Sequence, residues 1–337
     1  MSFDVSILKG KTVYDLIHAD VSGCIEVVRQ AYLTHGEGRT VNPDSYFLRF
    51  PDNPGARIIA LPAFLGPDSG VAGIKWIGSF PENVARGFPR ASAVLVLNDS
   101  TTGYPFAILE SSVISAARTA GSAALAAEWI NGRERRTRTL GIVGTGLIAR
   151  YVYRFLLAAG WEIEHVRLFD QGPGEAESFL STVVQPGAHA SALAAGSKEE
   201  LLRESSLIAL TTTAGTPHIA DPALFAHAPI VLHLSLRDLS PEILLASINI
   251  VDDVEHVMKA NTSPHLVEQR VGHRRFVAGT LAELMTGRCS IDRDKPVIFS
   301  PFGLGVLDLA VGKWVYDRAL MEGLDLRLTD FFYDMTR

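Results

Sequence analysis

Residues 139–149 read TLGIVGTGLIA, an apolar run that leads directly into two closely spaced glycines. The run has the length and β-branched content of a buried strand, and a helical pattern begins directly behind the glycines. Gly144 allows a tight turn, Gly146 lets the backbone approach a pyrophosphate, and Ala149 permits close packing of the helix on the strand. The start of a helix also attracts phosphate through its N–H groups. The segment therefore predicts a Rossmann-type dinucleotide-binding turn.

The acid in the next strand indicates which dinucleotide this turn would hold. Asp170 ends the strand-like run HVRLFD, 24 positions after Gly146. A carboxylate at that spacing accepts hydrogen bonds from the adenosine ribose hydroxyls. Gln171 and Gly172 follow and bring no arginine for a 2′-phosphate, so we expect NAD rather than NADP. A glycine motif alone also fits a plain strand–helix turn, and the acid favours the cofactor interpretation.

The segments around this motif predict the fold class. After it, strand-like runs at 206–213, 230–235 and 248–253 alternate with helical segments, which is typical of βαβ units and a parallel sheet. Before it, residues 57–109 contain short β-rich runs separated by Gly, Pro and Asn-Asp, which predicts a mostly antiparallel sheet. We therefore expect an α/β protein, with a Rossmann NAD-binding domain and a β-rich α+β domain.

Three further segments have a clear helical pattern. Apolar residues recur at helical spacing over residues 21–35, with Asp20 as a candidate N-cap. Residues 111–130 form one alanine-rich helical stretch that Asn131-Gly132 ends. Residues 297–323 predict a strand, a glycine turn and a final helix.

Composition and charge exclude several classes of protein. At 337 residues the chain is long enough for two domains, and 47% hydrophobic with 20% charged residues is the balance of a globular enzyme. The net charge is −6 and no basic run interleaves with aromatic residues, so we expect no nucleic-acid partner. The basic stretch RERRTR at 133–138 predicts a solvated loop. The apolar run at 91–97 is far shorter than the roughly 20 residues of a membrane span, so no membrane partner is expected.

Cysteine and histidine usage argues against disulfides and metals. The two cysteines, Cys24 and Cys289, provide neither a disulfide framework nor a CxxC zinc site. No histidine shows a metal-binding spacing such as HExxH. Because His233 lies in an apolar strand, we expect it to be packed in the core. The first residues lack the pattern of a signal peptide. We expect a cytoplasmic protein without a metal.

The carboxyl ends of the parallel strands should carry the chemistry, because ligands of open parallel sheets bind there. That rule places residues 211–213 and 235–238 beside the cofactor. Asp238 is then a candidate acid or base. Its alternative role is an N-cap or turn residue before Ser240-Pro241, and the sequence leaves both open.

Several strings in the first half resemble a known family. GIKWIG at 73–78, RAS at 90–92, LND at 97–99 and SAARTA at 115–120 resemble the ornithine cyclodeaminase/mu-crystallin family. The KWIG, RAS and LND strings are most similar to its branch of dehydrogenases that act on N-(2-amino-2-carboxyethyl)-L-glutamate. The resemblance runs from the Tyr46 region to SPFG at 300–303. It implies a homodimer, with a substrate-binding and dimerisation domain at 1–118, completed by 305–337, and a Rossmann domain at 119–304.

The resemblance also implies roles for individual residues. Lys75 and Asp238 match catalytic residues, and Lys75 and Arg118 match contacts to the substrate carboxylate. Arg49 and Arg57 match further substrate-binding positions, and Arg90 is a further candidate to bind a substrate carboxylate. The implied cofactor-binding residues are Thr119, Gly144, Thr145, Gly146, Leu147, Ile148, Asp170, Thr212, Thr213, Ser235, Ser300 and Gly303. Each charged residue has a plainer alternative: Lys75 on a solvent-facing strand position, Arg49 and Arg57 as sheet-surface cations, and Arg90 as a loop cap.

The implied reaction is NAD-dependent oxidative hydrolysis of N-(2-amino-2-carboxyethyl)-L-glutamate, which we call the adduct. Its products are 2-oxoglutarate and L-2,3-diaminopropionate, a precursor of siderophores such as staphyloferrin B or of peptide antibiotics. The adduct has three carboxylates, which arginines bind in bidentate geometry. Ornithine is disfavoured because residues 57–62 contain no acid for its distal amine. An amino-acid cyclodeaminase, an alanine-type dehydrogenase and a crystallin-like binding protein remain alternatives. The implied reaction on this small-molecule substrate requires the nicotinamide to face Lys75, Arg118 and Asp238.

Overall fold

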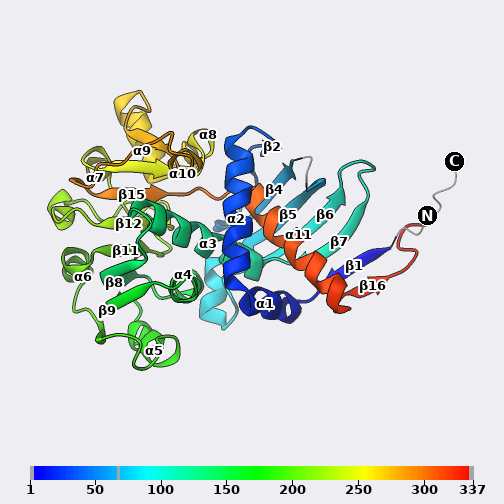
Figure 1. Cartoon of the computed structure of the whole chain (residues 1–337), viewed down its shortest axis with the longest axis horizontal. Coiled ribbons are helices and arrows are strands. Elements are labelled where there is room, and N and C mark those ends of the chain that lie inside the picture. The colour runs from blue at the N-terminus through cyan, green and yellow to red at the C-terminus, as the bar shows by residue number, and fades with distance from the viewer. Residues whose placement is uncertain (1–3, 67–68, 334–337) are drawn as a thin grey trace. The chain divides into compact units, whose positions relative to one another are not determined.

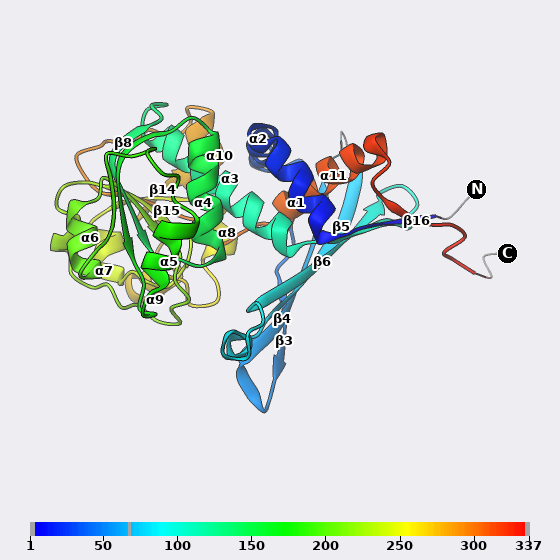
Figure 2. The same ribbon diagram turned by 90° about the horizontal axis from the view of Figure 1, so that it is seen from below.

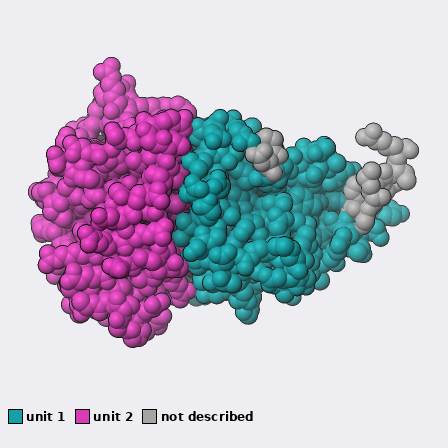
Figure 3. Space-filling model, in the orientation of Figure 1, with its two compact units in different colours: residues 1–118, 304–337 teal, residues 119–303 magenta. Residues whose placement is uncertain are grey.

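The computed structural model describes residues 4–66 and 69–333. Its contacts divide the chain into two compact units (Figure 3). Unit 1 comprises Met1–Arg118 and Leu304–Arg337, and unit 2 comprises Thr119–Gly303. No helix in the described parts of the chain is both long enough and apolar enough to cross a membrane.

Unit 1 is built on one mixed, largely antiparallel sheet (Figures 1 and 2). Its strand order is β16-β1-β7-β6-β5-β4-β2, and β3 pairs with the outer part of β4. The strands are β1 (Val5–Leu8), β2 (Thr40–Val41), β3 (Tyr46–Phe50), β4 (Asn53–Leu65), β5 (Val71–Ser79), β6 (Ala91–Asp99), β7 (Pro105–Glu110) and β16 (Leu326–Leu328). Among the described strands of this sheet, β1 and β7 are the only neighbours that pair in parallel. The β3–β4 hairpin projects beyond the rest of this sheet (Figure 2).

Helices cover one face of the unit 1 sheet. They are α1 (Gly10–Ala19), α2 (Val21–Gly36), α11 (Gly305–Glu322) and the first turns of α3 (Ser112–Ile130). A short 3-10 helix, η1 (Pro81–Arg86), links β5 to β6. Helix α11 packs on β4, β5 and β6. Glycines permit this approach: a Cβ at Gly73 would lie 2.9 Å from the Leu309 side chain, and one at Gly312 would lie 2.1 Å from Leu95. The close packing places the start of α11 against the middle of the sheet.

Unit 2 is built on an eight-stranded sheet in which every pair is parallel, with the order β10-β9-β8-β11-β12-β15-β13-β14. The strands are β8 (Arg136–Val143), β9 (Glu162–Phe169), β10 (Ser191–Ala194), β11 (Leu207–Leu210), β12 (Ile230–His233), β13 (Ile248–Val251), β14 (Val277–Thr280) and β15 (Val297–Ser300). The helices between them are α4 (Leu147–Ala158), α5 (Glu175–Thr182), α6 (Lys198–Glu204), η2 (Pro222–Phe225), α7 (Pro241–Leu245), α8 (Val254–Val257), α9 (Ser263–Val271) and α10 (Leu281–Met285). This topology confirms the predicted α/β class with a Rossmann-type sheet.

The local predictions can be compared element by element. Helix α2 begins where the sequence placed it, and Asp20 caps it by accepting a hydrogen bond from the Gly23 N–H at 2.8 Å. The loop predicted at 133–138 is wrong in its second half, because β8 begins at Arg136. Pairing of Arg136 with Glu162 on β9 keeps this backbone extended while the side chains stay exposed at the end of the strand. Strands β1 and β16 were not predicted.

Candidate functional site

The glycine turn of unit 2 has the geometry that a dinucleotide phosphate requires. Gly144 has φ +86°, and a Cβ there would lie 2.9 Å from the carbonyl of Thr211, so only glycine fits. Gly146 is the N-cap of α4, and a Cβ on it would meet no atom within 4 Å. Since Gly146 has no side chain, the first N–H groups of α4 are open to a phosphate group. The turn therefore fits the pyrophosphate of a dinucleotide.

Asp170 at the end of β9 holds this turn in place. Its Oδ2 accepts hydrogen bonds from the Thr145 backbone N–H at 2.7 Å and from the Thr145 hydroxyl at 2.9 Å. Its Oδ1 accepts the Gly172 N–H at 2.8 Å. Each carboxylate oxygen has two lone pairs, so Oδ1 retains capacity for a ribose hydroxyl. The predicted ribose acid thus also organises the phosphate turn.

A second cluster surrounds Asp238, which is fully buried in the loop after β12. Its Oδ1 accepts a hydrogen bond from the Thr212 hydroxyl at 2.5 Å and lies 3.0 Å from Nε2 of His218. The Ser235 hydroxyl donates to its Oδ2. Burial alone would raise the pKa of Asp238. A hydrogen bond from His233 and the charge of His233, together with hydrogen bonds from Ser235 and Thr212, hold this pKa well below its usual range. The carboxylate is therefore ionised at neutral pH.

The surroundings of Asp238 argue against the plain capping role. Ser240, not Asp238, is the N-cap of α7. Leu236 in the same loop has φ +74°, a strained conformation for leucine, and its carbonyl accepts the Ser263 N–H at 2.8 Å. Non-glycine residues are held in such conformations where the surrounding structure fixes them, often at functional sites. The loop is built to keep Asp238 against Thr212.

The turn that contains Ser300 and Gly303 also belongs to unit 2, and a buried acid fixes it. Asp252 accepts hydrogen bonds from the N–H groups of Phe302 at 2.9 Å and Gly303 at 2.7 Å. Burial raises the pKa of Asp252 in spite of these bonds. His233 is fully buried, as the sequence predicted, and its Nδ1 lies 3.2 Å from the Ser300 hydroxyl. Sequence reasoning missed Asp252, although it directly follows β13 at the carboxyl edge of the sheet.

In unit 1, Lys75 lies in a buried charged cluster. Its side chain on β5 is 2% exposed, and its Nζ donates to Oδ2 of Asp308 at 2.6 Å and to the Ser115 hydroxyl at 3.3 Å. Nε of Arg118, from α3, lies 3.4 Å from Oδ1 of Asp308. Burial lowers the pKa of Lys75 to about 8, Asp308 opposes that shift, and Arg118 adds to it. The solvent-facing alternative for Lys75 is therefore wrong, and the predicted pair Lys75 and Arg118 share an acid that the sequence did not reveal.

Three arginines gather at the outer end of the same sheet. Arg49 on β3 lies directly opposite Arg57 on β4, and Arg57 lies opposite Ser79 on β5. Arg90 donates from Nη1 to the Ser79 hydroxyl at 2.8 Å. Burial and the charge of Arg49 lower the pKa of Arg57, and burial and the charge of Arg57 lower the pKa of Arg90. We call Arg49, Arg57 and Arg90 the arginine cluster.

The arginine cluster has the character of an anion site. Like charges directly opposite each other on paired strands are unfavourable. Within the part of the chain that the structure describes, none of the three forms an ion pair with a carboxylate, and Nε of Arg57 is buried without a hydrogen-bond partner. A bound anion would satisfy this nitrogen and offset the repulsion. The surface-cation alternative does not account for the buried, unpaired guanidinium nitrogen of Arg57, whereas it agrees with the exposed side chain of Arg49.

The arginine cluster and Lys75 point to the same face of the sheet. Lys75 and Ser79 are four residues apart on β5, and residues separated by an even number share a face of a strand. At a rise of about 3.4 Å per residue, roughly 14 Å of strand separates them. One face of unit 1 therefore carries cationic groups at two places along the strand.

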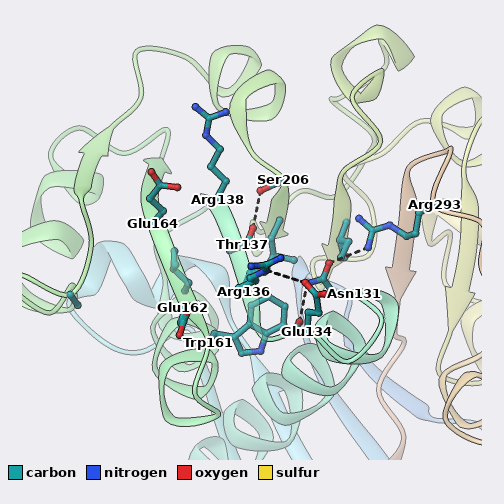
Figure 4. A pocket seen from close by; sticks show the side chains of 14 residues that line it. Asn131, Glu134, Arg136, Thr137, Arg138, Trp161, Glu162, Glu164, Ser206 and Arg293 are labelled. Atoms are coloured by element: carbon teal, nitrogen blue, oxygen red, sulfur yellow. Dashed lines mark hydrogen bonds and ion pairs between the residues drawn. The ribbon is translucent and has the colours of Figure 1, made fainter.

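A pocket of about 720 Å³ lies elsewhere in unit 2 (Figure 4). Its lining includes Arg136, Glu162, Leu207 and Ile230, the first residues of β8, β9, β11 and β12. These are the amino ends of parallel strands, whereas the glycine turn and Asp238 follow carboxyl ends. The pocket is therefore not the predicted cofactor site. Among the described residues, no group of His, Cys, Asp and Glu side chains could hold a metal ion.

Comparison with known proteins assigns the chain to a family. Residues 11–323 match the profile of the ornithine cyclodeaminase/mu-crystallin family. The chain belongs to this family. The resemblance seen in the sequence is thereby confirmed.

Individual relatives are similar over almost the whole chain. The chain is 27% identical to the N-((2S)-2-amino-2-carboxyethyl)-L-glutamate dehydrogenase of Staphylococcus aureus, over 90% of this chain and 92% of that protein. It is 27% identical to the alanine dehydrogenase of Archaeoglobus fulgidus, over 96% of this chain and 98% of that protein. The structure of Thermococcus litoralis Delta(1)-pyrroline-2-carboxylate reductase in complex with NADH and L-proline is similar in fold, with a TM-score of 0.87 and 23% identity, covering 96% of this chain and 99% of that chain.

The structure brings many of the predicted residues together within each unit. In unit 2, Thr145 contacts Asp170, and Thr212 and Ser235 contact Asp238. Thr119 lies in α3, and Thr213 is exposed in the loop after β11, so their cofactor roles stay predictions. The predicted positions at the start of α4, Leu147 and Ile148, follow the open glycine.

Proposed function

We propose that this family member oxidises N-(2-amino-2-carboxyethyl)-L-glutamate with NAD and releases 2-oxoglutarate and L-2,3-diaminopropionate, a precursor for siderophores or peptide antibiotics. The chain is an NAD-dependent oxidoreductase that acts on the CH–NH group of an amino acid, as its relatives are. The finer proposal concerns the substrate. It is supported by the Staphylococcus aureus relative and, within this chain, by the arginine cluster.

The arginine cluster is the observation on which the choice of substrate depends. The proposed adduct has three carboxylates, whereas alanine and ornithine have one each. Arg57 has a buried nitrogen without a hydrogen-bond partner, and its neighbours Arg49 and Arg90 repel it. A substrate with distal carboxylates offers bidentate partners for these guanidinium groups. A substrate without them would leave three arginines with no counter-charge.

Lys75 and Arg118 would bind the carboxylate next to the reacting carbon. Both are cations in a largely buried place, where a charge-assisted hydrogen bond is stronger than it is in water. With a pKa of about 8, Lys75 is mostly protonated at neutral pH and can still exchange its proton close to neutrality. It is therefore suited to hold a carboxylate and to transfer a proton at Nζ.

The reaction balances with water as the second reactant. NAD supplies the acceptor for the hydride that leaves the glutamate Cα, and a C=N bond to the bridging nitrogen forms as that nitrogen loses its proton. Water then adds to this carbon, and the C–N bond breaks to give 2-oxoglutarate and the free amine of diaminopropionate. Since Asp238 is buried and ionised, we propose that it holds Thr212 and His218 in the orientation that these proton transfers need.

One assay tests the substrate proposal. Purified protein is mixed with NAD and the synthetic adduct, and NADH absorbance is followed together with 2-oxoglutarate. Stoichiometric formation of both products is expected. Activity on L-alanine or L-ornithine, with none on the adduct, would overturn the substrate. NAD binding without turnover of any amino acid would favour the crystallin-like binding protein.

An alanine dehydrogenase is the second candidate, because the Archaeoglobus fulgidus relative is as similar in identity and covers more of the chain. The two candidates differ in what they demand of the arginine cluster. Oxidation of alanine needs one carboxylate site, which Lys75 and Arg118 provide. Neutralising the arginine cluster would therefore leave alanine oxidation unchanged but weaken oxidation of the adduct.

We also propose that a second copy of the chain covers the other face of the unit 1 sheet. That face exposes Tyr46 (72%), Leu48 (48%), Trp76 (43%) and Val94 (41%). Register places Tyr46 and Trp76 on either side of Ala60, and Val94 opposite Trp76. An exposed apolar sheet face of this kind marks an interaction site. Light scattering should give a dimer for the wild type and a monomer for Trp76→Lys; a monomeric wild type would refute the proposal.

A further inference from the structure

We propose that Asp308 is a positioning residue of the substrate site, whose carboxylate holds Lys75 and Arg118 in the arrangement that receives the substrate carboxylate. This inference rests on the proposed function in one respect: Lys75 and Arg118 are taken to bind substrate. The contribution of Asp308 to Lys75 itself stands on the geometry of unit 1 alone.

The fold brings Asp308 to Lys75 by a specific packing arrangement. Asp308 lies in the first turn of α11, where the positive end of the helix dipole favours a carboxylate. A Cβ at Gly305 would lie 3.2 Å from the Ala63 side chain on β4, so glycine lets this end of α11 approach the sheet. The amide oxygen of Asn42 accepts the Val306 N–H at 3.2 Å and fixes the same turn. The start of α11 is thus anchored against the strands.

Asp308 is the acid among the groups that face Lys75. The strand neighbours of Lys75 are Leu61 on β4 and Leu95 on β6, which are apolar. From α3, Ser115 accepts a hydrogen bond from Lys75, and Arg118 contributes a like charge. Burying a lysine without an acid is costly, because the charged form loses its hydration. Asp308 therefore makes a charged Lys75 possible at this position.

The two oxygens of Asp308 engage their partners unequally. Oδ2 lies 2.6 Å from Nζ of Lys75, a short charge-assisted hydrogen bond. Oδ1 lies 3.4 Å from Nε of Arg118 and has no partner within hydrogen-bond geometry. Lys75 is accordingly held by a short hydrogen bond, and Arg118 lies at ion-pair distance from the other oxygen of the same carboxylate. One carboxylate thus brings both cations to the same place.

Removal of this acid has a consequence with a definite sign. Asp308 raises the pKa of Lys75 against the effect of burial, so its loss lowers that pKa further below about 8. A smaller fraction of Lys75 would then be protonated at pH 7.5, so it would bind a carboxylate more weakly. Lowering the pH should restore the charge and part of the binding. A role in folding alone would not produce this dependence on pH.

The test compares Asp308→Asn with Asp317→Asn, a matched change on the same helix at an acid that pairs with Lys313. At pH 7.5, Asp308→Asn is expected to raise KM for the adduct about tenfold or more, which is ~1.4 kcal/mol. The increase should shrink at pH 6.5, and Asp317→Asn should match the wild type. A pH-independent increase, or an equal increase in both variants, would overturn the proposal.

A measurement without substrate separates this proposal from the proposed function. In protein labelled with ¹³C-lysine, NMR follows the titration of Lys75, whose signal is the one absent from Lys75→Met. Asp308→Asn should lower the Lys75 midpoint, and an unchanged midpoint refutes the role of Asp308 even if the adduct is turned over. A lowered midpoint in an enzyme that ignores the adduct would refute only the substrate. If Asp308→Asn does not fold, Asp308→Glu takes its place: the Lys75 titration midpoint should equal that of the wild type, and KM for the adduct should rise. A lower Lys75 midpoint in Asp308→Glu, or an unchanged KM, would refute the positioning role of Asp308.

Discussion

The Nζ atom of Lys75 lies 2.6 Å from Oδ2 of Asp308, and both side chains are almost entirely buried. The two residues are 233 positions apart in the sequence and meet because α11 packs on β5. A buried ion pair contributes little net stability, since both charges lose their hydration. Its presence here is better explained by a need for a charged, desolvated lysine at this place. That need can be measured through the pH dependence of stability.

The variant Lys75→Met should change how stability depends on pH. The pKa of Lys75 is about 8 in the folded protein and near its ordinary value of 10.5 in the unfolded chain. Between these pH values the unfolded state binds more protons, so the stability of the wild type relative to the variant rises with pH, by up to about 1.4 kcal/mol per unit. Below about pH 8 the difference should be constant. Urea unfolding of both proteins from pH 7 to 10 checks this, and a flat difference across that range would contradict a buried, charged Lys75.

Neutralising one member of the arginine cluster should weaken substrate binding without weakening the fold. Arg57→Gln removes a cation that Arg49 and Arg90 repel, so the free energy of unfolding should stay the same or increase by a few tenths of a kcal/mol. KM for the adduct should rise about 10- to 100-fold, since hydrogen bonds to charged groups contribute ~1.5–3 kcal/mol.

The matched control for this prediction is Arg86→Gln, an exposed arginine on η1 that pairs with Glu82. Its KM should equal that of the wild type. A loss of stability in Arg57→Gln without a change in KM would mean that the arginine cluster is structural.

The sequence predicted the Rossmann sheet well because its signals are local. The alternation of strands and helices, the glycine turn and Asp170 all lie within short windows, and each has a direct physical meaning. Strands β1 and β16 escaped prediction because they are short and pair with each other from opposite ends of the chain. No periodicity within one segment reports such a pairing.

The candidate site was predictable only where the motif itself carried the chemistry. Asp308 and Asp252 were missed because each looks like an ordinary acid in its local context, and their roles arise from tertiary contacts. Asp308 sits inside the apolar run GVLDLAV, and a charged residue there is a signal of a buried partner. The cross-strand pairing of Arg49 with Arg57 likewise depends on the register of a hairpin, which composition does not fix.

Asp238→Asn should abolish most of the turnover and keep the cofactor. The change removes the negative charge that the hydroxyls of Thr212 and Ser235 and the ring of His218 surround, while these hydroxyls can rotate to suit the new amide. A reduction in kcat of about 10²-fold or more is expected, in the range of lost acid–base assistance. Titration calorimetry should give an unchanged Kd for NAD. Asp221→Asn, an acid that caps η2 in the same unit, serves as control and should retain full kcat.

The two glycines of the phosphate turn should respond to alanine in opposite ways. At Gly146 the backbone is not in the left-handed region, with φ −73°, and the space around a Cβ is empty, so Gly146→Ala should leave stability unchanged or raise it by about 0.4–1 kcal/mol. The new methyl group stands where the backbone must approach a pyrophosphate, so NAD affinity should fall at least about tenfold.

At Gly144, φ +86° and a Cβ 2.9 Å from backbone atoms predict that Gly144→Ala loses more than about 1 kcal/mol of stability. Gly160→Ala is the control, because Gly160 has φ +81° in open space outside the turn: it should lose about 1 kcal/mol of stability and keep NAD affinity. Tight NAD binding by Gly146→Ala would show that the dinucleotide does not cross this turn.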